Sequence, residues 1–122
     1  MSYRIALAVA AATLMMGLVA GISQAAPKKL VGSVGPGFTI TLTSGGKKVT
    51  KLKAGTYTFV IADKASIHDF VLEQQTGGKF EKQLTSVPFV GTKTATVKLK
   101  KGKWKYYCAP HESAMFGYFV VT

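Results

Sequence analysis

Short runs in which apolar and polar side chains alternate, separated by glycine-rich turns, most strongly restrict what this chain can fold into. The runs cover residues 38–43, 57–61, 67–73, 94–99 and 103–108. A period of two is typical of strands that bury one face, and the threonine, valine, tyrosine and phenylalanine content of the runs also favours strands. The runs include no convincing amphipathic helix. The sequence therefore predicts an all-β fold.

The number and spacing of the runs predict a Greek-key antiparallel β-sandwich of about seven short strands. Residues 74–92 are the least regular part, because Gly77-Gly78 and Pro88 interrupt the alternation. For this part we expect a long connection with a short helical turn around Phe80 to Leu84.

Two of the predicted strands assign a face to His68, Asp69 and Phe38. In the run 67–73, alternation predicts that His68 points toward the core and that Asp69 lies on the opposite face. In the run 38–43, alternation places Phe38 on the same face as the apolar residues that follow it.

The first 25 residues have the features of a secretory signal segment. Residues 5–26 carry no charged side chain, and the apolar part of this stretch ends at Ile22. We expect cleavage after Ala25, which leaves residues 26–122 as one domain in the periplasm or another extracytoplasmic compartment. Because the apolar stretch is long for a signal segment, an uncleaved anchor is the alternative, and membrane contact would then follow.

Residues 26–122 are strongly basic. They carry fifteen lysines and five acidic residues, which gives a net charge of +10. A charge of this size favours anionic partners or an anionic surface. Several of the lysines flank two predicted turns, and their alternative role is to keep strand edges soluble. Nucleic acid is not an expected partner, because the signal segment would carry the domain away from it.

Candidate metal ligands gather in the last third of the chain. Cys108, His111 and Met115 lie within eight residues, and the other histidine, His68, belongs to another predicted strand. Two imidazoles, one thiolate and a weak axial thioether are the donor set that suits a blue-copper site. The single cysteine cannot form a disulfide within its own chain. The alternative for Cys108 is a small buried core residue.

The spacing of these residues requires a sharp turn. Cys108 ends an inward-facing row, and His111 reaches the same ion only if the chain reverses between them. Pro110 favours the turn, and it has no N–H that would donate a hydrogen bond to the sulfur. Three further residues allow the thioether of Met115 to return to the same ion. A site held by one tight loop and one core strand would be rigid, as one-electron transfer between Cu(I) and Cu(II) requires.

The segments His68-Asp69-Phe70 and Tyr107-Cys108-Ala109-Pro110-His111 resemble the metal-binding segments of the cupredoxins. The likeness is to small plastocyanin-like or pseudoazurin-like blue copper proteins, and it extends over essentially all of residues 26–122. It implies a cupredoxin-like Greek-key sandwich, one type 1 copper ion and a role in shuttling electrons.

The resemblance also implies roles for single residues. His68, Cys108 and His111 would be the equatorial copper ligands, and Met115 would be the axial ligand. The loop between His111 and Met115 is one residue shorter than plastocyanin-like loops usually are. Asp69 stands where the family commonly has an asparagine that ties the two ligand-bearing segments together. Its carboxylate would either add negative charge near the copper or face solvent.

The same resemblance implies how electrons would leave. The edge of His111 is expected to be exposed in an apolar patch, with Pro36, Pro110 and Ala114 as candidates for its rim. The expected partners are redox proteins with acidic docking surfaces, and the chain is expected to act as a monomer.

Other functions fit part of the pattern. A copper carrier or chaperone would use the same four donors, although exposed loops rich in methionine and histidine would then be expected. Zinc is disfavoured because paired cysteines are missing. A Cys108–histidine nucleophile is formally available, but a sandwich this small offers no obvious substrate cleft, so an enzyme is not expected. A metal-free binding module would require the spacing of Cys108, His111 and Met115 to be a coincidence.

Overall fold

The computed structural model describes residue 17 and residues 26–122 of the chain. The predicted signal segment, residues 1–25, lies outside the described residues apart from Gly17. Along the described part run ten strands and one turn of 3-10 helix: β1 (Lys28–Val34), β2 (Ile40–Ser44), β3 (Lys47–Lys48), β4 (Lys51–Leu52), β5 (Gly55–Asp63), β6 (Phe70–Gln74), β7 (Glu81–Thr85), β8 (Gly91–Leu99), β9 (Gly102–Tyr107), η1 (Ala109–His111) and β10 (Phe116–Val121). None of these residues forms a helix with the length and apolar character needed to cross a membrane.

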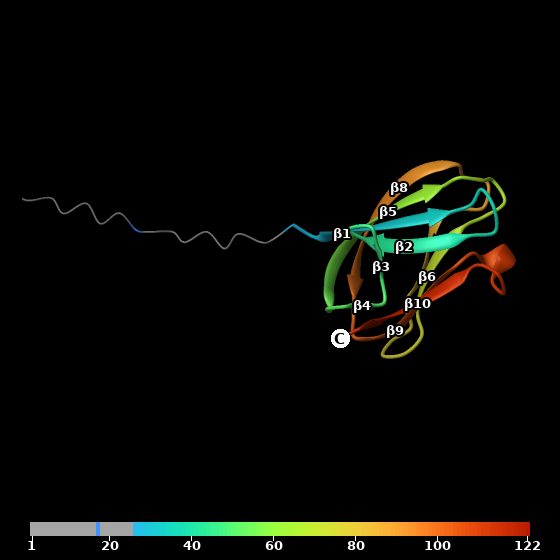
Figure 1. Cartoon of the computed structure of the whole chain (residues 1–122). Coiled ribbons are helices and arrows are strands. Elements are labelled where there is room, and N and C mark those ends of the chain that lie inside the picture. The colour runs from blue at the N-terminus through green and yellow to red at the C-terminus, as the bar shows by residue number, and fades with distance from the viewer. Residues whose placement is uncertain (1–16, 18–25) are drawn as a thin grey trace, which may run out of the picture.

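The strands form two five-stranded sheets that face each other (Figure 1). One sheet has the order β3-β2-β1-β5-β8, and the other has the order β4-β10-β9-β6-β7. The core between them follows the predicted alternation, because Tyr57, Phe59 and Ile61 of β5 are buried. Trp104 and Tyr106 of β9 are buried from the other side. The predicted all-β sandwich is confirmed.

The sheets are mixed, so the prediction of a wholly antiparallel sandwich was wrong. β1 pairs with β5 in parallel, and β10 pairs with β4 in parallel, while the other pairs are antiparallel. Alternation shows which face a side chain takes, but it does not show the direction of the neighbouring strand. The count of about seven strands was low because β3 and β4 are only two residues long and β7 has no alternating pattern.

The helical turn predicted around Phe80 to Leu84 was also wrong. Strand β7 occupies this segment, and it pairs with β6 along one edge of its sheet. Its first three residues are exposed and only Leu84 and Thr85 are buried. An edge strand of this kind gains its conformation from the backbone partners that β6 supplies, and a pattern in its own sequence is not required.

The connections between the strands lie at two opposite ends of the sandwich. Val34 pairs with Asp63 and Asp63 with Gly91, so one end holds four connections, and we call it the site end: residues 35–39, 64–69, 86–90 and 108–115. Lys28 pairs with Tyr57 and Gly55 with Leu99 at the opposite end. We call this the far end, and it holds the start of β1, the short strands β3 and β4, and the connections 45–46, 49–50, 53–54, 75–80 and 100–101.

Candidate metal centre

The loop between β9 and β10 brings three of the predicted ligands to the site end. Cys108 keeps an extended backbone, with φ −99° and ψ 116°, and is the N-cap of η1. Pro110 lies in the first turn of η1, as expected for the residue that reverses the chain. The loop is closed because Cys108 N–H donates to the carbonyl of Met115 at 3.0 Å, and Met115 N–H donates to the carbonyl of His111 at 2.9 Å.

His68 comes from the connection that precedes β6, rather than from the strand predicted over residues 67–73. The strand begins only at Phe70. His68 is fully buried, as expected from the sequence, although the reason is the path of the connection and not alternation. Gly35 makes room for the ring, because a Cβ at that position would come within 2.9 Å of the imidazole Cδ2, and its φ of +76° also favours glycine.

Three donor atoms converge at this end. The Nδ1 atoms of His68 and His111 are 3.2 Å apart, and the sulfur of Cys108 is 3.7 Å from the first and 3.6 Å from the second. A point equidistant from the three atoms lies about 2.0 Å from each, close to the metal–nitrogen and metal–sulfur bond lengths of about 2.0–2.3 Å that zinc sites show. The triangle therefore has the size that a single metal ion requires.

The four predicted ligands differ in exposure. His68, Cys108 and Met115 are buried, and His111 is half-buried. Met115 shares the closed loop with Cys108 and His111 through the two backbone hydrogen bonds described above. The structure thus assembles His68, Cys108 and His111 directly and keeps the methionine in the same small loop.

The surroundings of Cys108 raise the pKa of its thiol. Burial is the main cause and the Asp69 carboxylate adds to it, whereas the backbone N–H groups of Asp69 and His111 partly offset the rise. A metal that takes the thiolate must displace its proton, and the two N–H groups stabilise the sulfur once it is charged.

Of the two alternatives for Asp69, a carboxylate that faces solvent is excluded. The residue is 1% exposed, and its carboxylate accepts a 2.6 Å hydrogen bond from Ala109 N–H and a 2.9 Å hydrogen bond from Gln83 Nε2. Ala109 follows Cys108, and Asp69 follows His68. The carboxylate therefore ties the two ligand-bearing segments together.

Phe38 is the site residue that the sequence pattern misplaced. It precedes β2 and is 60% exposed, instead of facing the core. Its ring meets the two imidazoles edge to face, at centroid distances of 4.9 Å from His111 and 5.6 Å from His68. The phenylalanine covers part of the donor cluster on its solvent side.

The three residues predicted for the rim of an apolar patch around His111, namely Pro36, Pro110 and Ala114, are all exposed.

Among the described residues, three buried side-chain atoms have no hydrogen-bond partner: Oδ2 of Asp63, Nε2 of His68 and Oγ1 of Thr85. His68 turns its Nδ1 toward the donor cluster, so the unpartnered Nε2 points away from it. Burial raises the pKa of Asp63, while the nearby Thr85 hydroxyl, Ala65 N–H and the His68 ring lower it. A charged Asp63 therefore lowers the free energy of unfolding of the metal-free chain.

Replacing Asp63 with asparagine is expected to stabilise the metal-free chain at pH 7 by about 1 kcal/mol, the scale of one unsatisfied buried group. The folded chain holds the Asp63 proton more tightly than the unfolded chain does. The wild type therefore loses stability as the pH rises from below the unfolded value of about 3.9 through the folded-state pKa. Urea unfolding at pH 7 and pH 3 checks this. A gain of equal size at both pH values would contradict it.

Comparison with known proteins was made for sequence families, for curated proteins and for solved structures. No family model and no curated protein matches the chain. Solved structures do match, and one is the copper protein rusticyanin, with 21% identity, a TM-score of 0.57, and coverage of 77% of this chain and 76% of that chain. Two variants of amicyanin, both in the Cu(I) form, match with 17% and 15% identity and TM-scores of 0.52 and 0.51. They cover 81% and 77% of this chain, and 87% and 82% of their own.

A likeness at these identities establishes the fold alone. The chain has the cupredoxin fold, which confirms the fold expected from the resemblance. The plastocyanin-like or pseudoazurin-like subtype is not confirmed, since the structures named above are rusticyanin and amicyanin.

Proposed function

We propose that this chain is a mononuclear type 1 copper protein that carries single electrons between redox partners in an extracytoplasmic compartment. His68, Cys108 and His111 would be the equatorial ligands, and Met115 the axial ligand. The observation that carries the proposal is the triangle of one sulfur and two Nδ1 atoms with edges of 3.2 to 3.7 Å. The similar solved structures named above are themselves copper proteins by their description or by the Cu(I) form.

The chemistry of the donors favours copper over zinc. One buried thiolate, two imidazoles and a nearby thioether are soft donors that suit both Cu(I) and Cu(II). Structural zinc sites of small domains are usually completed by further cysteines or histidines, and residues 26–122 contain one cysteine and two histidines. Copper, when bound, would supply the exchange of one electron.

The protein's own residues would keep the donors in place while the charge changes. Cys108 is bounded by β9 and η1, and the loop is closed by its hydrogen bond to Met115. Asp69 joins this loop to the segment that carries His68. Phe38 excludes water from part of the donor cluster. Half-buried His111 is the ligand through which an electron would reach a partner.

Titration of the metal-free protein with Cu(II) tests the proposal. We expect intense visible absorption from sulfur-to-copper charge transfer at one equivalent of copper, and loss of this band in Cys108→Ser. Ser113→Ala is a matched control, because Ser113 is exposed in the same loop and is not a proposed ligand. A colourless wild type, or a Cys108→Ser variant that keeps the band, would refute the assignment.

Copper delivery is the second candidate, since a carrier would use the same donors. Burial of His68, Cys108 and Met115 favours the electron shuttle, because an ion held by buried donors is slow to leave. Stopped-flow mixing with a redox acceptor and with a copper acceptor separates the two. A shuttle changes its oxidation state and keeps the ion, whereas a carrier loses it.

The monomeric state and the acidic surface of the redox partner remain part of this proposal.

A further inference from the structure

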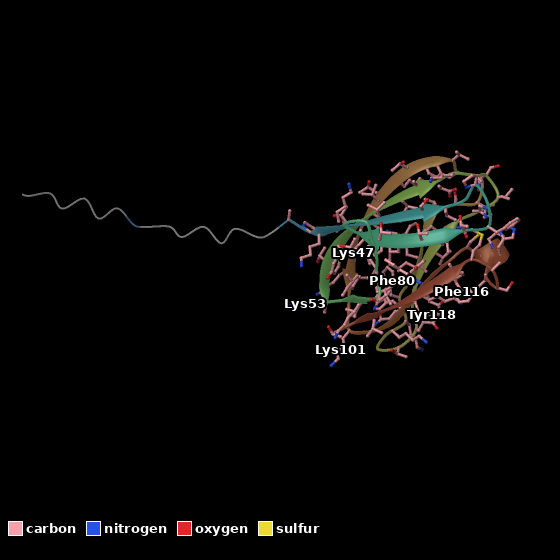
Figure 2. All side chains as sticks on the ribbon, viewed as in Figure 1. Lys47, Lys53, Phe80, Lys101, Phe116 and Tyr118 are labelled. Atoms are coloured by element: carbon pink, nitrogen blue, oxygen red, sulfur yellow. The ribbon has the colours of Figure 1, made fainter. Side chains whose placement is uncertain are left out.

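Lysine side chains gather at the far end of the sandwich, opposite the candidate metal centre. Figure 2 shows Lys47, Lys53 and Lys101 toward the end at which β1 begins. Eleven exposed lysines lie in the strand ends and connections of this end, and we call them the lysine cluster: Lys28, Lys29, Lys47, Lys48, Lys51, Lys53, Lys79, Lys98, Lys100, Lys101 and Lys103.

The fold creates this cluster from segments that are distant in the sequence. Lys51 of β4 pairs with Val120 of β10, which joins the middle of the chain to its end. The connection between β6 and β7 meets the turn between β8 and β9, where Lys103 N–H donates to the Thr76 hydroxyl at 2.8 Å. Three connections carry lysines of the cluster, namely 53–54, 75–80 and 100–101, and the other lysines lie in β3 and β4 and at the ends of β1, β8 and β9. The fold therefore presents them on one side of the molecule.

The lysines of the cluster outnumber the acidic residues near them, of which Glu81 begins β7 directly after the connection 75–80. The five acidic residues of the described chain lie at the site end or within the sheet that contains β6, β7 and β9: Asp63, Asp69, Glu73, Glu81 and Glu112. Among the described residues, the one recorded ion pair joins Lys105 to Glu112 at 2.7 Å, outside the cluster. The positive charge of the far end is therefore available to attract an anionic surface or molecule.

The chain enters the fold at the same end. Ala26 and Pro27 line a shallow groove together with Lys53 and Tyr57, next to the first residue of β1. The sequence before this point, residues 5–26, carries no charged side chain. In the alternative in which this segment is retained as an anchor, it would hold the far end, and with it the lysines, beside the bilayer.

We propose that the lysine cluster binds the headgroups of an anionic lipid surface and thereby turns the site end toward the aqueous compartment. Lysines near such a surface act additively over distances of about one Debye length, so a cluster on one end orients the molecule as well as attracting it. This interaction is separate from the proposed metal site and requires no bound ion.

The position of the cluster favours a lipid surface over an acidic redox protein. Strand β5 has nine residues and runs from the far end to the site end, a distance of about 27 Å at roughly 3.3 Å per residue. A partner steered onto the cluster would be held that far from His111. A membrane in the same place would leave His111 free to meet its partner.

Two triple variants of the full chain with the same net charge test the proposal. One is Lys51→Gln with Lys53→Gln and Lys101→Gln, and the matched control is Lys64→Gln with Lys82→Gln and Lys93→Gln, all six lysines being exposed. Co-sedimentation measures binding to phosphatidylcholine vesicles with and without about 30% phosphatidylglycerol. Because both variants keep the same N-terminal sequence, its contribution cancels.

We expect the cluster variant to bind anionic vesicles about tenfold or more weakly than the wild type, and the control variant to lose less than about threefold. Wild-type binding should fall steeply as salt rises from about 0.05 to 0.5 M. Equal losses in the two variants would mean that only net charge matters, and would overturn the proposal. So would binding to soluble polyglutamate without binding to anionic vesicles, which would assign the surface to an acidic protein.

Discussion

Replacing Asp69 with alanine is expected to weaken copper binding by about 10- to 100-fold, the usual effect of losing a residue that orients metal ligands. The carboxylate is buried and holds Ala109 N–H and the Gln83 amide at once. Without it, the segment with His68 and the loop with Cys108 lose their direct connection. Competition titration against a copper chelator measures the affinity, and circular dichroism shows whether the sheets remain. An affinity within about threefold of the wild type would contradict the role of Asp69.

Asp69→Asn separates the charge of this residue from its hydrogen bonds. An asparagine oxygen still accepts from Ala109 N–H, and Gln83 can turn its amide to face the new NH₂ group. Affinity should therefore be nearly retained. The lost negative charge should raise the reduction potential, by the order of 60 mV if the oxidised ion loses a tenfold preference. Voltammetry measures this, and an unchanged or lowered potential would show that Asp69 does not favour Cu(II) electrostatically.

Replacing Gly102 with alanine is expected to destabilise the fold by about 3–5 kcal/mol, a large part of the 5–15 kcal/mol that a domain of this size has. Gly102 has a φ of +148°, and a Cβ there would overlap the backbone carbonyl of Thr76. Neither backbone can yield easily, because Thr76 is bonded to Lys103 through both its N–H and its hydroxyl.

Gly45→Ala is the control for Gly102→Ala. Gly45 also has a positive φ, of +56°, but no atom lies within 4 Å of the position of a Cβ. The variant should lose only about 1 kcal/mol, the cost of a left-handed conformation for alanine. Urea unfolding compares the two variants. Equal losses would mean that φ alone matters, and that the contact between Gly102 and Thr76 does not.

The sequence predicted the strands that alternate and the residues with distinctive chemistry. Tyr57, Phe59 and Ile61 are buried because a strand with one buried face must repeat every two residues. Cys108 and His111 were identifiable because both lie in one short segment between two strand patterns. His68 was identifiable because it is the one other histidine of the chain.

The features that the sequence did not reveal depend on where the strands begin and on which segments meet. The alternating pattern continues through residues 67–69 in the sequence, but β6 begins only at Phe70, so the pattern does not assign a face to Asp69. The pattern also includes Phe38, although the following strand begins at Ile40. The lysine cluster combines several strands with three connections, and no local pattern indicates that these meet.

The closed loop between β9 and β10 supplies most of the proposed metal ligands, while the paired strands on both sides of it supply the stability of the fold. Three of the four proposed ligands lie between Cys108 and Met115, and the strands on both sides are already paired where Tyr107 meets Phe116. Insertions or exchanges inside this hairpin tip would change the choice of metal and the redox behaviour while leaving the scaffold intact. The chemistry of the site and the stability of the sandwich can therefore be changed independently of each other.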